Sequence, residues 1–237
     1  MPHYILPVPE FLRGKLLNYN RLYSYPNVAE APAKNGFIIL DSGAFALSRS
    51  KKKAKMGLDY MKALNSFYKA QISKYPDALV YCAAPDVYLH PDASIAQFET
   101  WHLHCDTPVV PVLQSKRKGT WDWNALKAQA RFYRQFQPTA IFVSNPGCRA
   151  AAVPVDEMQA IATLIRSETG ATHLHNFGAG WDAADIQGWA AMNVFDSIDS
   201  VAYYTAKTRF SDGSFDRDPT ARAIANAEHA NLLMGNL

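Results

Sequence analysis

Three aspartates in the sequence each come at or just after the end of a short apolar segment. Asp41 follows FIIL, Asp86 follows ALVYCAAP, and Asp199 lies inside SIDSVAY. Carboxylates gathered in one place could form an acid–base pair, a nucleophile with its partner, or a divalent metal site. An aspartate in such a position can also simply cap the following helix. The repetition of the pattern three times is what favours chemistry.

Other polar residues and glycines end further apolar segments in the same way. Gln114 follows PVVPVL, a polar turn follows AIFV, and an asparagine and a glycine follow THLH. We therefore expect a substrate-binding set that joins the three aspartates, and its members are Gln114, Ser144, Asn145, Gly147, Asn176 and Gly178.

The elements that would position these residues alternate along the chain, since β-like segments are separated by segments of helical period. The predicted strands are 3–8, 21–25, 37–40, 78–83, 108–113, 140–144, 172–177 and 197–203. The apolar helical stripes are Met61-Leu64-Tyr68-Ile72, Ile95-Phe98-His102-Cys105, Trp123-Leu126-Ala130-Tyr133 and Met158-Ile161-Ile165. A closing helix is predicted from Asp218-Pro219, a cap followed by proline, to about Met234.

Eight strands with crossover helices predict an α/β fold, specifically a single-domain (β/α)8 barrel over residues 1–237. A doubly wound open sheet would produce much the same pattern. In a barrel, the loops after the carboxyl ends of the strands meet at one mouth, which suits the polar residues described above. No glycine-rich nucleotide-binding motif follows any predicted strand, so the usual function of an open sheet has no support.

Composition limits the partners, the cysteine chemistry and the cellular compartment that the sequence is expected to have. The net charge of +3 neither establishes nor excludes a nucleic-acid partner. Three cysteines without CxxC spacing predict neither a disulfide framework nor a cysteine-rich zinc site, and they fit a reducing cytoplasm. No stretch approaches the roughly 20 apolar residues of a membrane span, so we expect no membrane association.

Two basic segments follow the predicted strand ends. KKKAK (51–55) comes after Asp41, and SKRKG (115–119) comes after Gln114. At a barrel mouth they would neutralise the phosphates of a nucleic acid, with Lys116, Arg117 and Lys118 as the contacts. The alternative is that both are ordinary solvated loops.

Histidine and tryptophan residues offer weaker signals. HLHC (102–105) and HLH (173–175) contain metal-ligating types, but His102 and Cys105 fall on an apolar helical stripe, so we expect no metal. Trp121, Trp123 and Trp181 could stack on bases, although Trp123 lies on a predicted core stripe.

Two segments carry a family resemblance. ILDSGAFAL resembles the DSGGFQ segment of the tRNA-guanine transglycosylases, and FDSIDSVAY resembles their DMFDCV segment, in which two aspartates are spaced by three. The resemblance covers about residues 36–215. The further positions that match the family pattern are, in order, Asp86, Gln114, the turn 145–147, FGAGWDAADI, and the pair Asp196 and Asp199.

Enzymes of that family exchange a guanine base in nucleic acid for a 7-deazaguanine by double displacement. The resemblance implies that Asp199 is the nucleophile, which attacks the sugar C1′, and that Asp41 moves the proton to and from the base. A carboxylate suits this chemistry because the transition state resembles an oxocarbenium ion. No cofactor is implied.

The resemblance also implies how the base and polymer are bound. Asp86 and Gln114 would read the hydrogen-bonding edge of the base, helped by the backbone at residues 144–147. Gly43 would let the flat base approach the chain closely, and Ser42 beside it is counted among the substrate-binding residues. Lys207 and Arg209 resemble in position the basic residues that hold the neighbouring nucleotides.

Departures from the family pattern bear on the substrate. Ala44 and Ala46 stand where the family has glycine and glutamine, and no cysteine follows Cys148, so the family's zinc site is absent. These losses resemble compact phage-type members that insert a 7-deazaguanine such as preQ0 or preQ1 into DNA. We therefore expect a DNA-directed pentosyltransferase in the cytoplasm, of the host if phage-encoded. The alternatives are exchange on tRNA, an N-glycosidase, and a non-catalytic nucleic-acid-binding protein.

Overall fold

The structure is a computed structural model. It describes residues 3–7, 21–27, 29, 37–44, 47, 57–117, 121–144, 154–178, 182–200, 202–207, 209–215 and 217–233. The predicted site residues Lys118, Asn145 and Gly147, the segment 51–55 and Trp181 lie outside these ranges.

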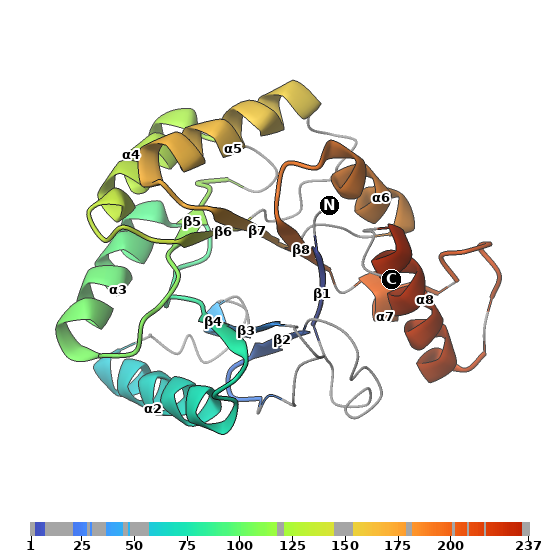
Figure 1. The fold of residues 1–237 in the computed structure, drawn as a ribbon, viewed down its shortest axis with the longest axis horizontal. Coiled ribbons are helices and arrows are strands. Elements are labelled where there is room, and N and C mark those ends of the chain that lie inside the picture. Colours follow the sequence, from blue (N-terminus) through green and yellow to red (C-terminus); the bar gives the residue numbers. More distant parts are fainter. Residues whose placement is uncertain are drawn as a thin grey trace.

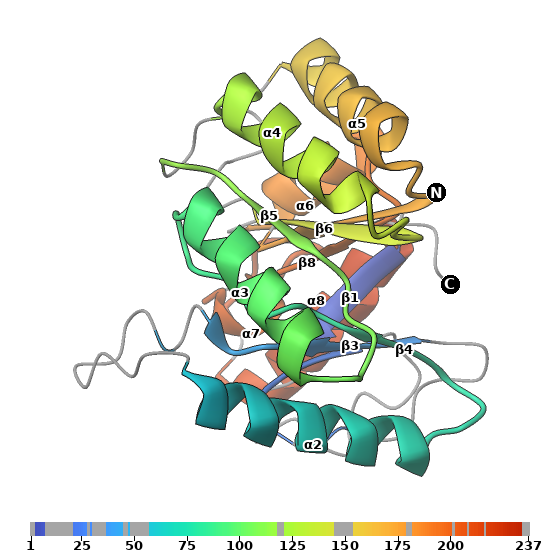
Figure 2. The same cartoon turned by 90° about the vertical axis from the view of Figure 1, so that its left-hand side faces the viewer.

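The described elements alternate as the sequence predicts for an α/β fold (Figures 1 and 2). The strands are β1 (His3–Pro7), β2 (Arg21–Ser24), β3 (Phe37–Asp41), β4 (Leu79–Cys82), β5 (Val112–Gln114), β6 (Ala140–Ser144), β7 (His173–Phe177) and β8 (Ser197–Asp199). The helices are α2 (Leu58–Lys74), α3 (Pro91–His104), α4 (Trp123–Arg134), α5 (Val155–Thr169), α6 (Ala183–Met192), α7 (Ala202–Thr205) and α8 (Pro219–Leu233).

All described strand pairs are parallel, and the sheet order is β4-β3-β2-β1-β8-β7-β6-β5. Each strand thus lies beside its neighbours in sequence, and β1 lies beside β8. An isolated parallel bridge joins Ala83, just after β4, to Val110, just before β5. There Ala84 N donates to Val110 O at 2.8 Å and Val110 N donates to Cys82 O at 2.7 Å. The end of β4 and the residue after it are therefore hydrogen-bonded to the segment just before β5.

The helices lie around the outside of the strands (Figure 1), and the two faces of the sheet carry separate apolar clusters. The face toward the helices includes Ile38, Leu40 and Leu174. The opposite face, here called the inner face, carries Leu22, Phe37, Ile39, Ala83, Val112 and Phe142. Because strand side chains alternate, Asp41, Gln114 and Ser144 continue the inner face at the carboxyl edge of the sheet.

The helical stripes are confirmed in α5 and need correction elsewhere. Met158, Ile161 and Ile165 are all buried. In α3 Phe98 is buried as predicted, but the other buried residues Ser94 and Trp101 each lie one position before the predicted Ile95 and His102, and His102 is exposed. The buried indole of Trp101 is paired, since its Nε1 donates to Thr107 O at 2.9 Å.

In α2 and α4, glutamines take places in the core that apolar residues were expected to fill. Gln71 is buried in α2, where its Oε1 accepts from Ala29 N at 3.0 Å, and the predicted Ile72 is 36% exposed. Gln129 is buried in α4, whereas the predicted Trp123 is 40% exposed. Each glutamine hydrogen-bonds a backbone group that would otherwise be buried without a partner.

Two strands also differ from the prediction by more than one residue at an end. The strand predicted at 108–113 is reduced to Val112–Gln114, since Pro111 has no N–H to donate to a ladder. The strand predicted at 197–203 ends at Asp199, and the short helix α7 begins at Ala202. Among the described residues, no helix has the length and apolarity required to cross a membrane.

Candidate active site

Asp41 is the last residue of β3, and the end of β2 holds its carboxyl group. The hydroxyl of Ser24, its register partner, donates to Asp41 Oδ2 at 2.8 Å. Burial raises the pKa of Asp41 above its usual value; the Ser24 hydrogen bond opposes this, and the negative charge of Asp199 adds to it. A carboxyl group with a raised pKa keeps its proton more readily near neutral pH, which suits proton transfer.

Asp86 lies beside Asp41 in a buried hydrogen-bonded group. Ser42 Oγ donates to Asp86 Oδ1 at 3.2 Å, and Gln114 Nε2 donates to Asp86 Oδ2. Burial raises the pKa of Asp86 to about 7 and the charge of Asp41 adds to the rise, while these hydrogen bonds oppose it. Near neutral pH this carboxyl group can therefore hold or release a proton.

The side-chain amide of Gln114 has a fixed orientation. Its Oε1 accepts from Leu89 N at 3.2 Å, so its Nε2 is the atom that faces Asp86. Gln129 of α4 holds the Gln114 backbone, since Gln114 N donates to Gln129 Oε1 and Gln129 Nε2 donates to Gln114 O, both at 2.9 Å. Gln129 was not predicted, and its polar side chain within the apolar period of α4 was the available signal.

Gly43 is required by its backbone conformation and by a close contact within the protein. Its φ is +78°, and a Cβ there would lie 3.1 Å from Tyr25 O and 3.4 Å from Tyr60 Oη. Tyr60 also donates to Ser42 O. Tyr25 and Tyr60 therefore occupy the side of Gly43 on which a Cβ would lie, and close approach of a base to this backbone stays a prediction.

Asp199 ends β8, and only 7% of its surface is exposed. Its Oδ1 accepts two hydrogen bonds, from Gly178 N at 3.0 Å and from His175 Nε2 at 3.1 Å. No group among the described residues hydrogen-bonds its Oδ2. The carboxylate is thus held through one oxygen, and the other has no protein partner in the described part of the chain.

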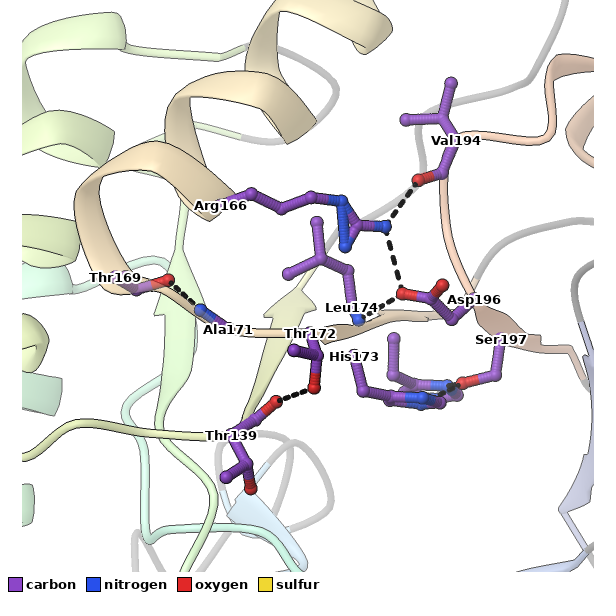
Figure 3. A network of polar contacts seen from close by, with 11 residues as sticks. Thr139, Arg166, Thr169, Ala171, Thr172, His173, Leu174, Val194, Asp196 and Ser197 are labelled. Carbon is purple, nitrogen blue, oxygen red and sulfur yellow. Dashed lines mark hydrogen bonds and ion pairs between the residues drawn. The ribbon is translucent and has the colours of Figure 1, made fainter.

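Asp196 has a different environment, although it belongs to the same spaced pair. Its Oδ2 accepts from Arg166 Nη2 of α5 at 3.0 Å and from Leu174 N at 2.7 Å (Figure 3). Arg166 Nη2 also donates to Val194 O at 3.3 Å. Asp196 therefore fixes the entry into β8 on the helix side of the sheet, away from the carboxyl edge.

The remaining predicted binding residues divide between the two faces. Ser144 ends β6 in register with Gln114 and Phe177, so it belongs to the same edge as Asp199. Gly178 contributes through its N–H, which is used on Asp199. Asn176 is corrected: it alternates with His175 and Phe177, so its amide lies on the helix side of β7, apart from the carboxylates.

The predicted basic residues that the structure describes form no ion pair with Asp41, Asp86 or Asp199. Lys116 and Arg117 are exposed after β5, and Lys116 Nζ lies 3.7 Å from Asp122 Oδ2 at the start of α4. Lys207 is exposed after α7. Arg209 is half-buried, and its backbone closes a turn with Gly213 and Ser214.

Within the described ranges, no cluster of three or more His, Cys, Asp or Glu side chains is arranged to hold a metal ion. His102 Nδ1 lies 2.9 Å from Phe98 O in its own helix. The imidazoles of His173 and His175 both lie 2.9 Å from Ser197 Oγ. Their role beside Asp199 was not predicted, and the signal was the alternation of HLH with Ser197 and Asp199 on the next strand.

The sequence matches no protein-family model, and a comparison with curated proteins gave no match either. Function is therefore inferred from the residues and their geometry.

Proposed function

We propose that this protein is a base-exchange glycosyltransferase that replaces guanine in DNA by a 7-deazaguanine through a covalent Asp199–glycosyl intermediate. One observation carries the proposal. Among the described residues, the Asp199 carboxylate is hydrogen-bonded through Oδ1 alone, while the charge of Asp199 helps to raise the pKa of a second carboxyl group, Asp41. Double displacement needs one carboxyl group that bonds to carbon and a second that carries the proton, and the raised pKa of Asp41 suits the second role.

The proposal places the site at the mouth of a closed (β/α)8 barrel. The strand register supports closure. Parallel pairs join β5 through β6, β7, β8, β1, β2 and β3 to β4, and the Ala83–Val110 bridge joins the chain just after β4 to the chain just before β5. Eight parallel strands with helices outside them are the elements of a barrel of this class.

In the first step of the proposed reaction, a lone pair of Asp199 Oδ2 forms a bond to the sugar C1′. The bond from C1′ to guanine N9 breaks, and its electron pair leaves with the base. Asp41 gives its proton to the departing guanine and becomes a carboxylate. The anion of Asp199 stabilises the positive charge that develops at C1′ before the covalent bond is complete.

In the second step, the incoming 7-deazaguanine gives its N9 proton to Asp41 and bonds to C1′, and Asp199 leaves as a carboxylate. The coupling between the two groups assists this sequence. Once Asp199 is an ester its charge is gone, so its contribution to the raised pKa of Asp41 is also gone. Asp41 is then more readily a carboxylate, the form that accepts the proton.

Base recognition in the proposal uses Asp86 and Gln114. The Watson–Crick edge of guanine offers N–H donors beside the O6 acceptor, and a carboxylate next to an amide is complementary to that edge. In this structure the two side chains hydrogen-bond each other. The base would have to replace that bond with its own contacts, and the fixed orientation of Gln114 keeps its Nε2 available as the donor.

Two parts of the proposal have alternatives, namely which nucleic acid is the substrate and which molecule accepts the sugar in the second step. Transfer of the sugar to water would make the protein an N-glycosidase with the same nucleophile, and tRNA could take the place of DNA. The experiment is to incubate the protein with guanine-labelled DNA or tRNA and preQ0 or preQ1, then to measure free guanine and modified nucleoside by mass spectrometry. Release with incorporation supports exchange. Release without incorporation indicates a glycosidase, and binding without release indicates a non-catalytic protein.

A further inference from the structure

A chain of polar contacts crosses the inner face of the sheet and ends on Asp199. His173 Nε2 and His175 Nδ1 both lie 2.9 Å from Ser197 Oγ, and His175 Nε2 lies 3.1 Å from Asp199 Oδ1. Figure 3 shows His173 directed at Ser197 on the neighbouring strand. The four residues alternate along β7 and β8, and the register pair His175–Ser197 brings them together.

The number of protons available fixes how this chain can be arranged. A carboxylate only accepts, so the proton between His175 and Asp199 belongs to Nε2. In a neutral His175, Nδ1 is then an acceptor, and the Ser197 hydroxyl donates its one proton to it. Ser197 Oγ can then accept from Nε2–H of His173. Each proton is used once, and all donors point toward Asp199.

We propose that His175 is a positioning residue for Asp199, held by Ser197 and His173 as the neutral tautomer with its proton on Nε2. This inference rests on the proposed function only in making Asp199 the nucleophile. The N–H of His175 and that of Gly178 fix Oδ1 from two sides, so Oδ2 is the oxygen that bonds to C1′. Asp199 and Ser197 both favour the Nε2–H tautomer. Without Ser197 one of these two contacts is lost, so the Nδ1–H form becomes more populated, and the donor to Asp199 is lost whenever the proton sits on Nδ1.

The surroundings of the two rings keep this arrangement in place. His175 is fully buried. Its ring makes T-shaped contacts with the rings of Phe142 and Phe177, at centroid distances of 5.2 and 4.8 Å. His173 stacks on Tyr81 at 5.3 Å and meets Phe37 at 5.9 Å. These contacts restrict ring rotation, and an apolar environment strengthens the hydrogen bonds within it.

The first test reads the tautomer directly and needs no activity. Nitrogen-15 NMR of ring-labelled histidine distinguishes a protonated Nε2 from a protonated Nδ1. We expect the His175 signals of the wild-type protein to show the Nε2–H form, and Ser197→Ala to shift them toward a mixture of tautomers. Ser197→Thr, which keeps the hydroxyl, should retain the wild-type form. An Nδ1–H form in the wild type, or no change in Ser197→Ala, overturns the proposal.

The second test measures the effect on bonding. His175→Phe keeps an aromatic ring but removes the donor, and it should slow formation of the covalent DNA adduct about tenfold or more with the DNA Kd unchanged. His175→Gln can present an N–H near the same place and should recover part of the rate.

His104→Gln, at an exposed position of α3, is the matched control. Equal loss in the Gln and Phe variants, or a loss of DNA binding in both, would mean that His175 only supports the fold. If the wild type forms no adduct, the proposed function fails, while the NMR result still decides the tautomer.

Discussion

The Asp199 carboxylate contributes to the raised pKa of Asp41, although the two residues end strands β8 and β3, which are separated in the sheet by β1 and β2. Each group also has its own hydrogen-bond partners, Ser24 for Asp41 and His175 with Gly178 for Asp199. The interaction between them is therefore one of charge, and a change at one aspartate should be felt at the other.

The first prediction follows from that relationship. Asp199→Asn should abolish the trapped enzyme–DNA adduct on a denaturing gel, because an amide has the shape of the carboxylate without its nucleophilicity. DNA binding, measured by fluorescence anisotropy, should be retained. The substitution also removes a negative charge, so the pKa of Asp41 should fall, which a carbon-13 NMR titration of the carboxyl group would detect. A covalent band from Asp199→Asn would make Asp41 the next residue to test.

A second prediction concerns the polymer. Removing Lys116, Arg117 and Lys118 together should weaken DNA binding and flatten its salt dependence, because log K changes by about 0.9 per log salt unit for each phosphate neutralised. The control removes three cations from helix surfaces, Lys62, Lys69 and Lys127, and should leave the slope close to that of the wild type. If both triple variants change the slope equally, the residues after β5 are ordinary solvated surface.

The third prediction concerns stability and pH. Asp86 has a pKa of about 7 in the folded protein and an ordinary value of 3.8, so the folded state binds more protons than the unfolded state between these values. Stability therefore falls as the pH rises from about 4 to 7, by about 1.4 kcal/mol for each unit of pKa difference. Above pH 7 this contribution is constant.

Asp86→Asn should reduce that pH dependence, because asparagine does not titrate and can still hydrogen-bond Ser42 and Gln114. Urea unfolding of both proteins from pH 4.5 to 8 measures it. The raised pKa of Asp41 acts in the same direction and remains in the variant, so some dependence should persist. Identical pH profiles for the two proteins would contradict a raised pKa for Asp86.

The main outline of this site could be predicted because it depends on local pattern. Apolar segments that stop at Asp41, Gln114 and Asp199 place these side chains at the carboxyl ends of parallel strands, and such ends share one edge of a sheet. Asp86 belongs with them because it hydrogen-bonds Gln114. Placing these residues at the carboxyl edge requires only that the strands be identified, and it does not require their register.

What could not be predicted depends on register and helix rotation. The His175–Ser197 contact exists because these two residues are paired across β7 and β8, and a slip of one residue would put Ser197 on the other face. Likewise, an apolar period cannot distinguish Trp123 from Gln129 as the residue turned inward in α4. The answer depends on which backbone group needs a partner, in this case that of Gln114.

The last prediction separates the role of Asp41 from that of Asp199. The departure of guanine requires a protonated Asp41, so its rate in the wild type should fall as the pH rises through the raised pKa of that group. Asp41→Asn should be slower in both guanine release and entry of the new base, and its rate should lack this alkaline decline. It should still form some adduct, since Asp199 is intact. Single-turnover release of labelled guanine, followed from pH 5 to 9 in both proteins, makes the comparison. Ser66→Ala, at an exposed position of α2, is a control that should keep the wild-type profile. If Asp41→Asn keeps the alkaline decline, another group carries the proton, and Asp86, with its pKa of about 7, is the one to test next.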